Sequence, residues 1–227
     1  MTPPPCLRIA LILALLTTPA IAQPPAPPPA APTPAVKPEA LKTDAAVGST
    51  VENLQAASAE STRQAALMDA YAKKADAEGF TQVASLFRAV KRSNEIHKTV
   101  IEESLKKLGG APKPPDKTPL PETKATKDNL AAAMKTAKAT KDNTLIVYRR
   151  RANEDKNKDA DTTFRYIRES YIEHARYMEA ALDTLPQTRT GTKDYYVSRV
   201  CGYMVEKLDI KKCPVCGSER DKFEKVN

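Results

Sequence analysis

An internal repeat limits the possible folds of this chain more than any other sequence feature. Displacing the segment around Phe87 by 77 residues places it on the segment around Phe164. The displacement aligns residues of similar character: Phe87 with Phe164, Arg88 with Arg165, Val90 with Ile167, His97 with His174, Ile101 with Met178, Leu105 with Leu182 and Leu108 with Leu185. Spacings of three and four residues put the apolar members on one face of a helix. The repeat predicts a duplicated helical hairpin, and therefore an all-α fold built on an antiparallel four-helix bundle.

Glycines and prolines mark the ends of the four expected helices. We expect helices over about 51–77, 81–108, 126–153 and 159–185, because glycine or proline follows each of the first, second and fourth. The joints after the first and third helices are short, whereas the proline-rich joint between the second and third is long. This pattern indicates two hairpins joined by a crossover, with the bundle spanning residues 47–186.

The first 46 residues are predicted to lie outside the bundle. Residues 1–22 are typical of a secretory signal, with Arg8 before a short apolar run and Ala20-Ile21-Ala22 at its end. The run is too short to span a bilayer, and no later apolar segment is longer. Residues 23–46 are rich in proline and alanine and are typical of an extended tether. We expect an exported protein, periplasmic or secreted, without a membrane span.

The positive charge of the chain gives little support to nucleic-acid binding. The formal net charge is +8, but the lysines are spread among acidic residues and tryptophan is absent. A phosphate-binding glycine loop and a Ser/His/Asp set are not recognisable either. We therefore expect no nucleic-acid partner.

The predicted inner faces of the bundle become polar at mid-length. The second helix places Asn94 and His97 there, and the fourth places Tyr171 and His174. These two histidines are the only ones in the chain and occupy equivalent positions in the repeat. The expected inner stripes of the other two helices carry mostly small side chains: Leu54, Ser58, Ser61, Ala65, Met68 and Ala72 on the first, and Leu130, Ala133, Ala137, Thr140, Thr144 and Val147 on the third.

Two helical segments carry a resemblance to a known family. AYAKKADAEGFTQVASLFRAVKRSNEIHK and DTTFRYIRESYIEHARYMEAAL resemble the helices of rubrerythrin, a ferritin-like di-iron family. The resemblance implies that His97 and His174 correspond to the histidines of two Glu-x-x-His motifs. It also implies peroxide reduction or electron transfer in oxidative-stress defence, with a redox partner and, by analogy, a homodimer.

The glutamates that the resemblance implies are replaced in this chain. Their positions are occupied by Asn94, Tyr171, Ser61, Ala137 and Thr140. Glu60 is one residue away from its expected position, which turns it about 100° from the inner face, and Glu95 and Glu173 are also at the wrong helical angle. Two irons need several carboxylates to offset their charge. We therefore expect no di-iron centre, and the sequence leaves open whether the protein is an enzyme.

Three interpretations of the polar layer remain open. The first is a buried cluster in which Asn94, Tyr171, Thr140 and Ser61 satisfy the two imidazoles. The second is a single metal ion held by His97 and His174. The third is a haem between the two histidines.

The C-terminal segment has the spacing of a metal-binding knuckle pair. It reads Ser198-x-x-Cys201-Gly202 and then Cys213-Pro214-x-Cys216-Gly217. This frame resembles the rubredoxin-like module of rubrerythrin, in which two knuckles hold one iron with four thiolates, and we place it at residues 187–227. Ser198 stands where the first cysteine of that module would be, and Tyr203 and Phe223 fit its small core.

Two interpretations of the cysteines follow. Because Cys6 lies in the expected signal, three cysteines remain, an odd number for a disulfide framework. Iron or zinc can be held by Cys201, Cys213 and Cys216, with Ser198 or water as the fourth ligand. Alternatively, Cys213 and Cys216 form a disulfide and Cys201 is free. We expect an exported, rubrerythrin-like metal-binding or redox protein; the alternative is a non-catalytic binding or structural bundle.

Overall fold

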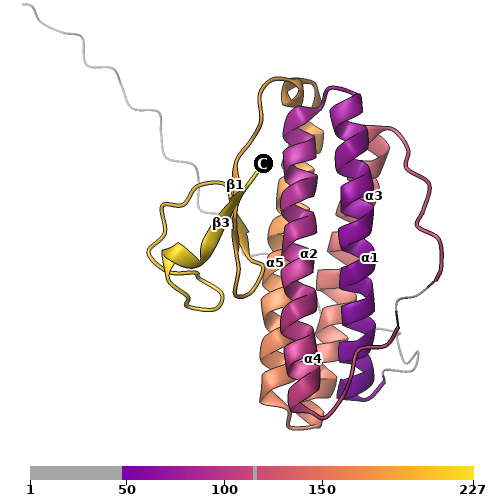
Figure 1. The fold of residues 1–227 in the computed structure, drawn as a ribbon, viewed down its shortest axis with the longest axis vertical. Helices are drawn as coiled ribbons and strands as arrows, with labels where there is room; N and C mark the ends of the chain where they lie inside the picture. Colours follow the sequence, from indigo (N-terminus) through magenta and orange to yellow (C-terminus); the bar gives the residue numbers. More distant parts are fainter. Residues whose placement is uncertain (1–47, 115–116) are drawn as a thin grey trace, which may run out of the picture. The chain divides into compact units, whose positions relative to one another are not determined.

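The computed structural model describes residues 48–114 and 117–227, and all of them belong to one compact unit, Thr43–Asn227. The signal and tether predicted over residues 1–46 lie outside the described residues. The elements are, in order, α1 (Thr50–Ala77), α2 (Thr81–Lys107), α3 (Thr126–Ala139), η1 (Thr140–Thr144), α4 (Leu145–Glu154), α5 (Lys158–Asp183), η2 (Leu185–Arg189), β1 (Tyr195–Ser198), β2 (Met204–Val205), η3 (Arg220–Lys222) and β3 (Phe223–Val226) (Figure 1).

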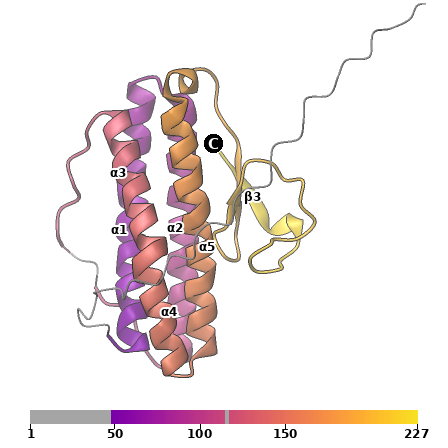
Figure 2. The ribbon, with the colours of Figure 1, turned by 180° about the vertical axis from the view of Figure 1, so that it is seen from behind.

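The long helices form the predicted four-helix bundle. α1 and α2 make one hairpin, and the second is made by α5 with the long helical run α3–η1–α4 (Figures 1 and 2). The long joint between α2 and α3 runs along α1. There Gln55 Nε2 donates to the Ala111 carbonyl at 2.8 Å, and Arg63 Nη1 donates to the Thr118 carbonyl at 2.9 Å.

Local hydrogen bonds fix where the helices begin. Ser49 and Glu52 form a capping box at α1, in which the Ser49 backbone N–H donates to Glu52 Oε2 at 2.8 Å. Asn157 caps α5 by accepting from the Ala160 backbone N–H at 3.0 Å. At α3, the backbone N–H of Thr126 donates to Glu78 Oε2 at 2.8 Å, so the end of the first helix helps to start the third.

The core consists of two apolar clusters separated by a polar layer. One cluster is centred on Met68, Leu86 and Phe87, and the other on Ile101 and Phe164. Between them lie buried polar side chains from three helices: Ser58, Ser61 and Gln64 on α1, Ser93, Asn94 and His97 on α2, and Ser170 and His174 on α5. The expected polar layer is therefore present at mid-bundle.

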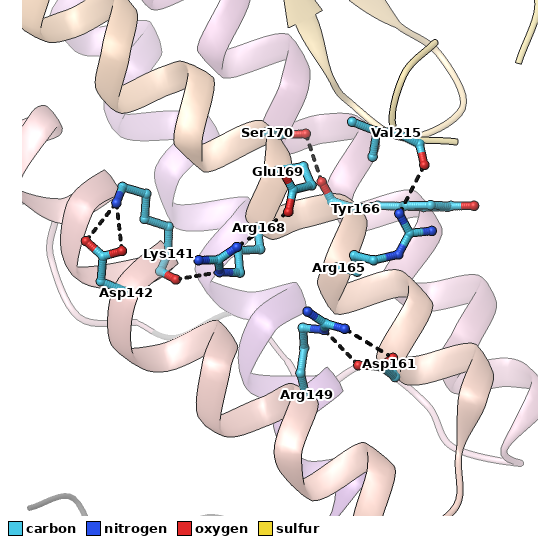
Figure 3. A network of polar contacts seen from close by, with 10 residues as sticks. All are labelled: Lys141, Asp142, Arg149, Asp161, Arg165, Tyr166, Arg168, Glu169, Ser170 and Val215. Atoms are coloured by element: carbon cyan, nitrogen blue, oxygen red, sulfur yellow. Dashed lines mark hydrogen bonds and ion pairs between the residues drawn. The ribbon is translucent and has the colours of Figure 1, made fainter. Parts of the chain in front are cut away.

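The third helix differs from the prediction of one continuous α-helix. Residues 140–144 form a π-helical turn, η1, which inserts one extra residue into the helical repeat. As a result, Thr144 is exposed and Leu145 is buried in its place, so the expected inner stripe is wrong at Thr144, whereas Val147 is buried as expected. The carbonyl of Lys141 in this turn accepts from Arg168 Nε of α5 at 3.0 Å (Figure 3).

The C-terminal segment forms a small antiparallel sheet with strand order β2-β1-β3. Tyr195, Val197 and Met204 of this sheet are buried in the same apolar cluster as residues of α2. Arg165 Nη1 of α5 donates to the Val215 carbonyl at 3.2 Å, which ties the second knuckle to the bundle (Figure 3). Of the described helices, none has the length and apolar character needed to cross a bilayer.

Candidate metal centre

The two knuckles have the same backbone construction. In the first, the Gly202 N–H donates to the Ser198 carbonyl at 2.9 Å, and in the second the Gly217 N–H donates to the Cys213 carbonyl at 2.9 Å. Both glycines have positive φ, +76° and +74°, which side-chain-bearing residues rarely adopt. These tight turns direct the cysteine side chains toward a common point.

The three cysteines converge in a geometry that suits one metal ion. The Sγ atoms of Cys201, Cys213 and Cys216 all lie within 4.8 Å of one another, and the first two are 3.7 Å apart. A tetrahedral site with metal–sulfur bonds of about 2.3 Å has a sulfur–sulfur edge of roughly 3.8 Å. Thiols so placed suit a tetrahedral iron or zinc site.

Ser198 completes the group from the end of β1. The residue is fully buried, its Oγ accepts from the Val200 N–H at 3.3 Å, and its hydroxyl hydrogen-bonds the Cys201 thiol. The side chains that the sequence assigned to one site, Ser198 and the three cysteines, therefore lie next to one another.

The thiols differ in acidity because they hydrogen-bond one another. Hydrogen bonds with the Cys201 and Cys213 thiols lower the pKa of Cys216 below its ordinary value. The hydrogen bond to Cys213, a second to Cys216 and burial all raise the pKa of Cys201. Cys216 is therefore the first of the three to ionise, and a bound metal would have to displace the remaining protons.

The first knuckle rests directly on the polar layer of the bundle. Ser93 Oγ donates to the Gly202 carbonyl at 2.6 Å, and the same oxygen lies 2.9 Å from His174 Nε2 and 3.4 Å from His97 Nε2. Ser170 Oγ reaches the Cys201 carbonyl at 3.5 Å. Ser93 and Ser170 are equivalent in the 77-residue repeat, so one serine from each hairpin contacts the knuckle.

The predicted hydrogen-bond partners of the imidazoles are wrong. Tyr171 does bond Asn94, through its hydroxyl to Oδ1 at 3.0 Å, but the Nε2 atoms of both histidines face Ser93. The buried Nδ1 atoms of both histidines have no partner in the described part of the chain. Sequence reasoning missed Ser93, although a serine precedes the central polar residue in both repeats.

Burial keeps both imidazoles neutral. It lowers the pKa of His97 to about 3, against a smaller opposing effect of the Cys201 backbone. Burial also lowers the pKa of His174 well below its ordinary value, and the neighbouring His97 adds to this effect. Neutral imidazoles are hydrogen-bonding groups and metal ligands rather than charges.

The polar layer does not fit the larger cofactors considered from sequence. Within residues 48–114 and 117–227, the cysteine triad is the only group of three or more His, Cys, Asp or Glu side chains that could hold a metal ion. The carboxylates that two irons require are therefore missing around His97 and His174. Ser93 Oγ occupies the space that a haem iron ligated by both Nε2 atoms would need.

Comparison with known proteins places this arrangement in a family. The family model described as rubrerythrin matches residues 45–182, more than half of the chain. The chain belongs to the rubrerythrin family. It is similar to nigerythrin from Nitratidesulfovibrio vulgaris, with 28% identity over 179 residues that cover 78% of this chain and 87% of nigerythrin. It is also similar to Rubrerythrin-2 from Clostridium acetobutylicum, with 32% identity over 79 residues covering 34% of this chain and 43% of that protein.

Solved structures agree with the sequence comparison. The fully reduced, all-ferrous state of nigerythrin has a TM-score of 0.74 and 27% identity, covering 82% of this chain and 91% of that chain. Mycobacterium tuberculosis bacterioferritin has a TM-score of 0.53 at 19% identity, which shows the shared fold alone. The predicted ferritin-like bundle with a rubredoxin-like C-terminal module is thus confirmed as a fold.

Proposed function

We propose that this rubrerythrin-family protein is exported and binds one iron or zinc ion through Cys201, Cys213 and Cys216. Ser198 or a water molecule supplies the fourth ligand. The observation that carries the proposal is the convergence of three thiols within 4.8 Å beside a buried serine. A bound iron would supply one-electron transfer to a redox partner, whereas zinc would stabilise the knuckles. By analogy with the family, the chain forms a homodimer.

The proposed function does not include di-iron peroxidase chemistry. Two of the substituted positions, Asn94 and Tyr171, are bonded to each other rather than free to coordinate, and the Asn94 amide also donates to the Val90 carbonyl at 2.9 Å. The alternative is a non-catalytic binding or structural bundle that retains the family fold.

A second, weaker metal position is favoured by one observation. The buried Nδ1 atoms of His97 and His174 are without partners among the described residues, and their ring centroids are 6.1 Å apart. A single ion such as Zn²⁺ held by His97 and His174 with water would require both Nδ1 atoms to turn toward it, because both Nε2 atoms lie against Ser93 Oγ.

Metal content of the mature protein, purified from its native compartment, tests these assignments. We expect about one iron or zinc per chain, lost in Cys213→Ser and retained in Thr190→Ser, which changes an exposed side chain away from the thiols. Additional metal lost in His174→Ala would assign the second position. A mature protein without metal would contradict the proposal and favour the structural alternative.

A further inference from the structure

A pocket of about 320 Å³ opens beside the polar layer, away from the cysteine knuckles. Its walls come from α1, η1, α4 and α5, and Tyr171 forms part of the wall nearest to the histidines. The Tyr171 ring is stacked on His97, with centroids 5.9 Å apart. The volume is at the lower end for ligand pockets, which restricts an occupant to a small molecule.

The pocket presents hydroxyl groups that have no hydrogen-bond partner among the described residues. Ser61 is only 3% exposed and lines the pocket, yet its hydroxyl bonds nothing within the described residues. The side-chain hydroxyls of Thr140 and Tyr148, also in the walls, likewise make no bond there. Because these hydroxyls line the cavity and are not committed to protein partners in the described part of the chain, they are available to hydrogen-bond a ligand there.

The charge in the pocket is a single carboxylate. Glu60 lines the pocket and accepts from Gln64 Nε2 at 2.7 Å, but among the described residues it forms no ion pair. This is notable in a chain with 36 Lys and Arg residues against 28 Asp and Glu. Within residues 48–114 and 117–227 the walls contain no Lys, Arg or His, so an anion would meet repulsion without compensation.

The π-helical turn shapes one wall of the pocket. η1 brings Thr140 to the pocket, and the Arg168 bond to the Lys141 carbonyl fixes the turn against α5 (Figure 3). Ser61 and Thr140 stand at positions where the family resemblance places glutamates. The pocket therefore lies where longer side chains would otherwise project.

We propose that this pocket binds a small organic ammonium ion. Its charged group pairs with Glu60 and donates hydrogen bonds to Ser61 and Thr140. Its apolar body packs against Ile167 and the Tyr148 ring. The face of that ring also attracts the nearby positive charge. This site is separate from the cysteine centre and does not depend on the metal proposed there.

Calorimetry on the full chain with benzylammonium tests the class of ligand. We expect saturable binding of benzylammonium, at least tenfold weaker binding of benzyl alcohol, and none of benzoate. Glu60→Gln is expected to weaken benzylammonium binding at least tenfold. The matched control Glu103→Gln, which removes an exposed carboxylate of α2, should change affinity less than twofold.

Three results would overturn the proposal. They are no binding of benzylammonium at millimolar concentration, equal binding of benzoate, or unchanged affinity in Glu60→Gln. Location is tested with Ser61→Val, which removes a pocket hydroxyl and narrows the cavity and should weaken binding at least tenfold, while its melting temperature shows that the bundle is folded. Cys213→Ser should leave binding unchanged, and loss of binding in that variant would place the ligand elsewhere.

Discussion

The residue at position 198 determines how many thiolates face the proposed metal position. Ser198 is fully buried against the Cys201 thiol, so Ser198→Cys would add a fourth sulfur without new exposed surface. Because thiolate binds iron and zinc more strongly than a serine hydroxyl, we expect metal loss to a chelator to slow at least tenfold. Metal release followed over time in both proteins measures this change.

An exposed cysteine provides the control for this variant. Thr190→Cys adds a thiol on the surface, and it should leave the rate of metal release unchanged. If Ser198→Cys releases metal as fast as the parent chain, position 198 does not coordinate the ion.

The buried histidines make stability depend on pH. The pKa of His97 is lowered to about 3 by burial, and that of His174 is also lowered, whereas unfolded histidine titrates near 6.5. Between these values the unfolded chain binds more protons, so the stability that neutral imidazoles confer is complete above about pH 6.5 and is lost as pH falls. Each histidine contributes up to about 1.4 kcal/mol per pH unit in this window.

Urea unfolding at pH 7 and pH 5 measures this effect. Relative to the parent chain, His174→Gln should lose about 2 kcal/mol less unfolding free energy between the two pH values, because it has one buried imidazole fewer to protonate. Identical pH dependence in the two proteins would mean that His174 is protonated in the folded state.

Among the elements, the first knuckle packs closely against α2 because Gly202 has no side chain. A Cβ on Gly202 would lie 2.6 Å from the His97 ring and 2.9 Å from the Ser93 carbonyl oxygen, whereas a Cβ on Gly217 would meet nothing within 4 Å. The two glycines have similar positive φ angles. Gly217→Ala should therefore lower the unfolding free energy only by the backbone strain, about 1 kcal/mol. Gly202→Ala adds steric overlap in the core and should cost roughly 1–3 kcal/mol more in unfolding free energy, measured in urea. Equal losses would show that the knuckle can move away from α2 without cost.

The π-helical turn allows a test by deletion of one residue. Removing exposed Asn143 should convert η1 to regular α-helix, because a π turn contains one residue more than the α-helical repeat. Leu145 then takes the inner position predicted for Thr144, so the bundle should remain folded by circular dichroism. The wall at Thr140 is expected to change, and benzylammonium binding should fall. Unchanged binding in a folded deletion variant would separate the pocket from this turn.

At the scale of the whole molecule, the bundle could be predicted because its signals are periodic. Repeated apolar spacing and the glycines and prolines between helices depend on local chemistry, as do the paired knuckle motifs. The spacing also predicted that Ser198 lies beside the cysteines. The structure brings those four side chains together as the sequence indicated.

The parts that could not be predicted depend on contacts between distant segments. Ser93 bonds the Gly202 carbonyl 109 residues away, and no local pattern shows which backbone group will arrive there. The change of register at η1 had a faint signal, since Leu145 follows polar Thr144, but helical periodicity alone assumes an uninterrupted α-helix. The family resemblance likewise implies that glutamates are replaced, but it does not indicate that smaller side chains leave a pocket.

The contact between sheet and bundle predicts that the two unfold together. Tyr195, Val197 and Met204 are at most 2% exposed and share an apolar cluster with α2. Burying a large apolar side chain contributes about 1.5–3 kcal/mol, an upper estimate because unfolded chains are partly compact.

Removing residues 191–227 should therefore lower the unfolding free energy of the bundle by about 4 kcal/mol. The intact chain should show a single urea transition, with the same midpoint by helical circular dichroism and by tyrosine fluorescence. Removing Asn227 alone, which is exposed and lies outside that cluster, serves as the control and should leave the midpoint unchanged. Two separate transitions, or an unshifted bundle midpoint after truncation, would mean that the sheet folds independently and that its position over Ser93 adds nothing to the stability of the helices.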